Sequence, residues 1–284
     1  MKWEGRRQSE NVEDRRGLGT TGKVVAGGGA VGIIFLLIQL FLGGDDGQIM
    51  QQLENQMNQG GGSQAPTELT AEEKVVGQFI STVLADTEDI WKKLFQEKGM
   101  VYKEPKLVLF KDVTRSACGG ASGSTGPFYC PGDETVYIDM SFFNTLKQRF
   151  GAKGGDFAIA YVIAHEIGHH VQNQMGILRE TQNLRQRLNE AQGNQVQVAT
   201  ELQADFLAGV WAHHINKYLE AGDAEEAINA AAAVGDDNIQ NNTQGYTVPE
   251  TYTHGTSKER MYWFNRGYQS GNIDDGDTFG AKLK

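Results

Sequence analysis

Residues 161–172 read Y-V-I-A-H-E-I-G-H-H-V-Q, an apolar run that leads into the arrangement H-E-x-x-H. If this stretch is helical, His165 and His169 lie one turn apart on one face, so both imidazoles can reach a single metal ion. Glu166 lies about 100° further round the helix, which places its carboxylate beside the ion as a general base. The apolar neighbours predict that this polar cluster is buried in a helix.

A chance match is the alternative, because two histidines at helical spacing also occur as hydrogen-bonded core residues or on a solvated face. With six histidines in 284 residues, we expect an accidental H-E-x-x-H in about one such chain in a hundred. A catalytic zinc ion takes three protein ligands and keeps one position for water. The metal hypothesis therefore needs a third ligand, and residues 170–175, H-V-Q-N-Q-M, do not contain it.

A second helix is predicted by residues 198–213, which read V-A-T-E-L-Q-A-D-F-L-A-G-V-W-A-H. Glu201 and Asp205 are four residues apart and share a face of this helix. We expect Glu201 to be the third zinc ligand and Asp205 to accept the free N–H of a ligating histidine, which fixes its tautomer. Two exposed acids at the edge of an amphipathic helix are the alternative, and this segment alone does not decide between them.

The chain resembles the bacterial family of putative neutral zinc metallopeptidases. The resemblance runs from about residue 107 to residue 279 and includes the apolar amino-terminal stretch. It implies an α+β, zincin-like fold with a small sheet and active-site helices, and a zinc ion held by His165, His169 and Glu201 with Glu166 as base. The motifs that carry it are H-E-I-G-H-H-V-Q (165–172), E-L-Q-A-D (201–205), G-D-D-N-I-Q (235–240), T-H-G-T-S-K-E-R (253–260) and W-F-N-R-G (263–267).

A more distant resemblance links residues 253–260 to membrane gluzincins of the heat-shock and prenyl-protein peptidase type. Thr253, His254 and Arg260 match their T-H-P-x-x-x-x-R segment, with Gly255 in place of the proline. Peptide hydrolysis builds up an oxyanion, and a hydrogen-bond donor across the cleft lowers the barrier. We therefore predict a catalytic role for His254 and consider Arg260 the weaker candidate. The alternative is a surface histidine and an arginine in a salt bridge.

The amino-terminal part predicts a membrane protein. Residues 1–23 are rich in charges of both signs, and we expect a disordered cytoplasmic tail. Residues 24–42 carry no charge, and as a helix they span about 28 Å, close to the thickness of the hydrocarbon core. Basic residues precede this predicted transmembrane anchor, so the positive-inside rule places the catalytic domain in the periplasm or outside the cell. A cleaved signal peptide is the competing interpretation, disfavoured by the long preceding segment and the lack of an A-x-A site.

Residues 43–66, rich in Gln, Asn and Gly, predict a flexible linker before a catalytic domain at 67–284. In that domain we expect a helix at 70–98 and strands at 106–111 and 135–140. The two cysteines of the chain, Cys118 and Cys130, predict a disulfide that stabilises the fold by about 3 kcal/mol. A zinc site built from their sulfurs is disfavoured, because no further Cys or His lies nearby. Further helices are predicted at 177–197, 223–234 and 257–268.

The charge composition of the chain argues against one class of binding partner. The formal net charge is −10, and no basic cluster suited to phosphate occurs beyond the amino-terminal segment, so nucleic acid is not an expected partner. We expect zinc-dependent hydrolysis of a peptide or protein substrate outside the cytoplasmic membrane. The competing hypothesis is a membrane-tethered peptide-binding or scaffold protein with a non-catalytic zinc site. His170, His213 and His214 are expected to be packing or surface residues.

Overall fold

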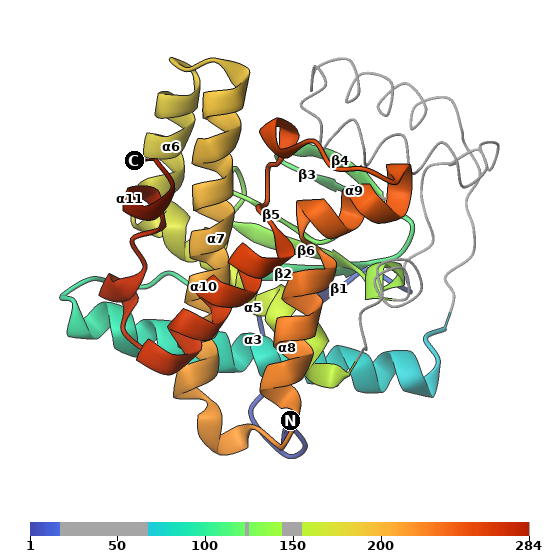
Figure 1. Ribbon diagram of the computed structural model, residues 1–284. Helices are drawn as coiled ribbons and strands as arrows, with labels where there is room; N and C mark the ends of the chain where they lie inside the picture. Colours follow the sequence, from blue (N-terminus) through green and yellow to red (C-terminus); the bar gives the residue numbers. More distant parts are fainter. Residues whose placement is uncertain (18–67, 123–124, 144–154, 284) are drawn as a thin grey trace.

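The computed structural model describes residues 1–17, 68–122, 125–143 and 155–283 (Figure 1). These residues form an α+β fold of a small mixed sheet and several helices, which confirms the predicted class. The predicted anchor at 24–42 and the predicted linker at 43–66 lie outside the described residues. Among the residues that are described, no helix is both long enough and apolar enough to cross a membrane.

The main sheet has the strand order β1-β2-β6-β5. Strands β1, β2 and β6 are parallel, whereas β5 runs antiparallel to β6. Strands β2 and β6 confirm the two predicted strands, and β6 is internal to the sheet rather than an edge. The edge on that side is β5. The bounds are β1 (Val12–Asp14), β2 (Lys106–Phe110), β5 (Phe128–Cys130) and β6 (Thr135–Asp139).

The predicted disulfide is present and joins a small hairpin to this edge strand. Strands β3 (Val113–Ser116) and β4 (Gly119–Ser122) pair antiparallel. Cys118 lies in the turn between them and is bonded to Cys130 at the end of β5, with 5.8 Å between the Cα atoms. The cross-link therefore fixes the hairpin against the end of β5.

The helices have clear start signals. Thr70 and Glu73 form a capping box at the start of α3. Residues 177–197, predicted as one helix, are instead divided, because Asn189 caps a new helix through the N–H of Gln192. The helices are α3 (Ala71–Glu97), α5 (Asp156–Gln174), α6 (Ile177–Arg185), α7 (Glu190–His214), α8 (Asp223–Ala233), α9 (Asp236–Gln244), α10 (Ser257–Ser270) and α11 (Thr278–Lys282), with short 3-10 turns η1 (Asn216–Tyr218), η2 (Pro249–Thr251) and η3 (Ile273–Asp275).

The core surrounds α5. On one side lie the apolar residues of β2 and β6, and on the other lie α7 and α10. Phe157 of α5 stacks on Trp211 of α7, with 5.9 Å between the ring centroids. Helices α7 and α10 cross closely, since a Cβ atom added at Gly209 would lie 2.0 Å from the carbonyl oxygen of Phe264. This crossing brings residues of α10 against the buried part of α7.

The expectation of disorder for residues 1–23 is wrong for residues 1–17. This amino-terminal segment supplies β1 and lies along α3, with its first residue near the start of α8 (Figure 1). Its charges have partners: Arg7 bonds to Glu88 at 3.0 Å, and Arg16 bonds to Asp14. A charged composition predicts disorder only where such partners are missing, and here α3 provides several of them.

Candidate metal centre

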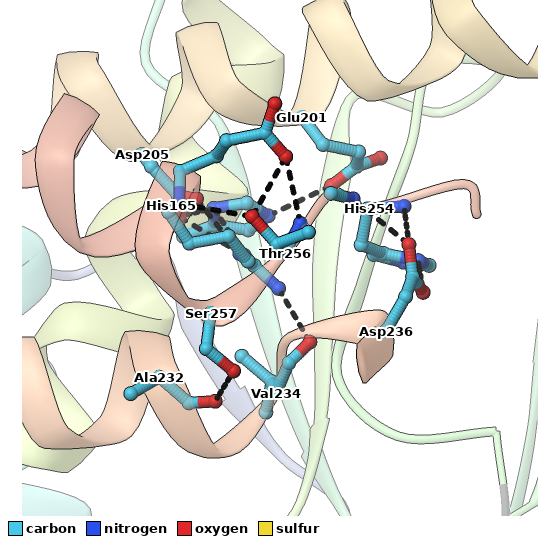
Figure 2. A network of polar contacts seen from close by, with 12 residues as sticks. His165, Glu201, Asp205, Ala232, Val234, Asp236, His254, Thr256 and Ser257 are labelled. Carbon is cyan, nitrogen blue, oxygen red and sulfur yellow. Dashed lines mark hydrogen bonds and ion pairs between the residues drawn. The ribbon is translucent and has the colours of Figure 1, made fainter. Parts of the chain in front are cut away.

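The three predicted ligands lie together between α5 and α7, and Figure 2 shows two of them, His165 and Glu201. His165 and His169 lie one turn apart on α5, as their spacing predicts, and Glu201 faces them from α7. The Nε2 atoms of His165 and His169 lie 3.2 and 3.4 Å from the same oxygen, Oε2 of Glu201. The candidate ligand atoms of all three residues lie within 4.8 Å of one another. One small ion can therefore be reached by all three.

A glycine lets the two helices come this close. A Cβ atom at Gly168 would lie 2.9 Å from the carbonyl oxygen of Ala204 on α7, closer than such atoms pack. Gly168 costs α5 about 1 kcal/mol of helix propensity relative to alanine. Because glycine has no side chain, the backbones of α5 and α7 come into contact next to the histidines of α5 and Glu201 of α7.

Both histidines are held with Nε2 facing the cluster. Nδ1 of His165 lies 2.8 Å from Oδ1 of Asp205, and Nδ1 of His169 lies 2.8 Å from Oε1 of Gln172. A carboxylate or amide oxygen only accepts, so each Nδ1 carries a proton, which leaves Nε2 as the nitrogen that can bind a metal once it is deprotonated. Asp205 therefore accepts the Nδ1–H of His165. Gln172, three residues after His169 and fully buried, was not predicted.

The orientation of Gln172 is fixed by α7. Its amide nitrogen donates to the carbonyl oxygen of Thr200 at 2.8 Å, which leaves Oε1 to face His169. The partner of each imidazole therefore depends on α7, through the Asp205 side chain in one case and through the Thr200 backbone in the other. Such outer partners orient ligands and raise their basicity.

Asp205 in turn is held by Arg260 and Tyr161. The Arg260 guanidinium is 3% exposed and donates to both carboxylate oxygens of Asp205, at 2.8 and 3.0 Å. The Tyr161 hydroxyl donates to the same carboxylate at 2.6 Å. Burial raises the pKa of Asp205, but the charges of Arg260 and His165 outweigh burial and lower that pKa to about 2. The salt bridge considered for Arg260 is thus found, and its guanidinium supports Asp205.

Glu166 lies next to the ligands and is nearly buried, at 8% exposure. Burial raises its pKa, and the nearby charges of His165 and His169 offset only part of this rise. A general base with a raised pKa holds a proton more readily than a free carboxylate, which suits proton transfer near neutral pH. The geometry and the environment both fit the predicted base.

His254 belongs to a loop that one carboxylate fixes. Oδ2 of Asp236, at the start of α9, accepts the backbone N–H groups of residues 253, 254 and 255 at 2.7 to 2.9 Å. The imidazole contacts Thr253 and lies 3.5 Å from Oδ1 of Asp236 (Figure 2). Its charge helps to lower the pKa of Glu201, after the larger contributions of burial, which raises it, and of His169. His254 therefore lies close enough to Glu201 for its charge to act on that carboxylate.

The donor set fits a zinc ion. Two imidazole nitrogens and one carboxylate oxygen are the ligands of one class of catalytic zinc site, and they leave one position open.

A second group of acids, Asp156, Asp223 and Glu226, also lies close together. There the amino group of Met1 contacts Asp156 at 3.0 Å and Asp223 at 3.3 Å, so this second group already holds a cation.

Zinc uptake should release protons at pH 7. Burial lowers the pKa of His165, but the Asp205 carboxylate outweighs burial and raises it to about 10, and Glu201 likewise raises the pKa of His169. The metal-free site therefore holds protons that ligation must displace. We expect release of at least about one proton per zinc bound, from His165, and an affinity that increases with pH. Calorimetric titration of metal-free protein in buffers of different ionisation enthalpy measures this release, and uptake without release would contradict it.

Comparison with known proteins agrees with this donor set. A family model described as putative neutral zinc metallopeptidase matches residues 1–279. Uncharacterized protein YpfJ of Escherichia coli (strain K12) is 44% identical over 296 residues, which cover 100% of both chains. Uncharacterized protein Rv2575 of Mycobacterium tuberculosis (strain ATCC 25618 / H37Rv) is 46% identical over 204 residues, 68% of this chain and 67% of the relative. No solved structure matches this chain.

Proposed function

Because the chain belongs to the putative neutral zinc metallopeptidase family, we propose that it is a zinc-dependent endopeptidase. The observation that carries the proposal is the convergence of His165, His169 and Glu201 on one point, with Glu166 buried beside them. A purely structural zinc site takes four protein ligands, and this cluster offers three. The open position and the adjacent base favour hydrolysis over a structural role.

The residues divide the chemistry between them. His165, His169 and Glu201 would hold a zinc ion, which would supply Lewis-acid chemistry and lower the pKa of a water molecule to about 7. Glu166 takes a proton from the attacking water and passes it to the leaving amine nitrogen, first as base and then as acid. Its raised pKa supports the second of these steps, because a carboxyl group that holds its proton can return it.

Three further residues assist. Asp205 and Gln172 keep the imidazoles in the tautomer that binds metal. We propose that His254 donates to the oxyanion that develops on the substrate carbonyl, since its loop is held rigid by Asp236 near Glu201. A donor that is already held in position does not have to reorient during the reaction, so its hydrogen bond stabilises the oxyanion more effectively.

We propose that the substrate runs along β5. This strand ends the sheet and is the strand of that sheet tied to the metal helix through Tyr129, whose hydroxyl lies 2.9 Å from Nδ1 of His170 on α5. His170 thus proves to be a packing residue, as expected, with its other nitrogen 2.7 Å from the carbonyl oxygen of Lys103. An extended peptide adds to an edge strand through main-chain hydrogen bonds.

Zinc content and cleavage measured together test the proposal. The full chain is used, because residues 1–17 belong to the fold. We expect one zinc per chain and cleavage of a mixed peptide library that a chelator abolishes and added zinc restores. Glu201→Ala should weaken zinc binding by more than the 10- to 100-fold typical for loss of an outer partner. Glu97→Ala, at an exposed position of α3, is the matched control.

Two results would count against the proposal. Undiminished zinc binding by Glu201→Ala would exclude this residue as a ligand. A zinc-loaded wild type that cleaves no peptide in the library would favour the competing hypothesis of a peptide-binding protein with an idle zinc site.

A further inference from the structure

The amino-terminal segment, residues 1–17, is built into the catalytic domain. Strand β1 pairs in parallel with β2, with Val12, Glu13 and Asp14 opposite Leu107, Val108 and Leu109. The ladder is extended by hydrogen bonds from the N–H of Leu107 to Asn11 at 2.9 Å and from the N–H of Arg15 to Leu109 at 2.7 Å. These bonds fix one register and attach the segment to the sheet that carries β5.

A buried carboxylate of α3 depends on this segment. Glu88 is 1% exposed, and its hydrogen-bond donors are Arg7, Ser9 and Asn11. Removing those donors would leave a charged group buried without compensation, which is strongly unfavourable. The segment is therefore part of the folded unit rather than an accessory to it.

Apolar and backbone contacts hold the first residues as well. Trp3 packs edge-on against Phe79 of α3, with 5.7 Å between the ring centroids. The N–H of Lys2 donates to the carbonyl oxygen of Tyr218 at 2.8 Å, and the Arg6 guanidinium stacks on the ring of Tyr218. Contacts therefore run along the segment from residue 2 to residue 16.

The segment ends where the rest of the domain begins. Arg16, 6% exposed, donates from Nη1 to the carbonyl oxygen of Glu73 at 2.9 Å. Glu73 lies in the first turn of α3, shortly after residue 68, at which the described chain resumes. The chain thus departs from and returns to one corner of the same folded unit.

The proximity of Arg16 to Glu73 limits how the chain between the two parts can cross a membrane. A chain that departs from and returns to one folded unit must cross any bilayer an even number of times. Between residues 17 and 68 the sequence offers one uncharged stretch of membrane-spanning length, residues 24–42, and residues 43–66 are too polar for a second. A single crossing would separate Arg7 from Glu88 and β1 from β2.

We infer that residues 1–17 and residues 68–283 lie on the same side of the membrane. The inference replaces the hydropathy-based topology, in which the amino terminus is cytoplasmic and the catalytic domain is outside. It assigns the surface formed by α3 and β2 to residues 1–17 of the same chain. It is independent of peptidase activity.

Side-specific labelling of the full chain in intact cells tests the inference. Glu10→Cys and Lys93→Cys place a thiol at exposed positions of the amino-terminal segment and of α3. A membrane-impermeant maleimide should give the same result for both variants, either labelling in intact cells or labelling only after permeabilisation. Wild type, with its cysteines in the disulfide, is the blank. Labelling of one variant in intact cells and of the other only after permeabilisation would overturn the inference.

Charge reversal tests the docking itself. Arg7→Glu places a like charge against Glu88 and Asp89. We expect the melting temperature of the purified full chain to fall by roughly 5 °C or more. Gln8→Glu adds a negative charge at the neighbouring exposed position and should leave the melting temperature nearly unchanged. Equal melting temperatures for the two variants would show that the segment is not docked, and would overturn the inference.

Discussion

Glu166→Gln is expected to bind one zinc ion like the wild type and to cleave peptides about 10²- to 10⁴-fold more slowly. The change is nearly isosteric, and Glu166 is not among the three ligands that converge on the metal position. It removes the one step assigned to this residue, transfer of a proton from water to the leaving amine. Metal content by elemental analysis and kcat/KM on a cleaved library peptide measure the two effects separately.

Glu97→Gln is the matched control for this variant. It makes the same chemical change at an exposed position of α3, where the expected effect on kcat/KM is negligible. A Glu166→Gln protein that cleaves at the wild-type rate would remove Glu166 from the mechanism. One that has lost its zinc would mean that Glu166 holds the site together instead of acting as base.

Arg260→Met is expected to destabilise the fold by about 3–5 kcal/mol, the typical cost of removing one partner of a buried ion pair. Methionine fills much of the volume but leaves the Asp205 carboxylate charged and fully buried beside Tyr161. Because Asp205 orients His165, zinc affinity should fall as well. Denaturant unfolding of the metal-free protein measures the first effect, and zinc titration measures the second.

Arg266→Met is the control for this variant, since Arg266 lies on the same helix and is exposed. We expect it to change stability by less than about 1 kcal/mol. The double variant Arg260→Met/Asp205→Asn should recover part of the lost stability, because the uncompensated charge is removed. If Arg260→Met unfolds at the wild-type denaturant concentration, the ion pair is not important for stability.

The pH dependence of stability follows from the Arg260–Asp205 ion pair. The folded-state pKa of Asp205 is about 2, below the value of 3.8 for a free aspartate. A lowered carboxyl pKa contributes stability that is fully present above the unfolded value and is lost as the pH falls towards 2. Without Arg260, the pKa of Asp205 should rise, so acid unfolding of Arg260→Met should begin at a higher pH than that of wild type.

The candidate ligands could be predicted because their positions follow from helical periodicity. Four-residue spacing fixes the relative positions of His165 and His169, and again of Glu201 and Asp205, whatever the rest of the fold. Helical periodicity does not determine that α5 packs against α7. We predicted this pairing because a catalytic zinc site needs a third protein ligand. Strand β2 was likewise visible as a short apolar run and β6 as an alternating one.

Other parts of the site and of the fold could not be predicted from the local sequence. Gln172 has the right spacing from His169, but its role depends on the backbone of Thr200, which lies 28 residues away in sequence. Asp236 orders the His254 loop from the start of α9, a helix that the polar composition of residues 236–244 did not predict. Strand β1 is short and charged, and it is a strand only because β2 pairs with it.

The pairing of β1 with β2 also sets an order of events during synthesis. Residues 12–14 leave the ribosome long before β2, which begins at residue 106. At about 5–20 residues per second, β1 waits roughly 5–20 s for its partner strand. During that interval the uncharged stretch at residues 24–42 is already made, while the surface that retains residues 1–17 does not yet exist. Any engagement of residues 24–42 by a membrane would therefore compete in time with docking of β1, and the rate of translation between residues 42 and 110 would influence which occurs first.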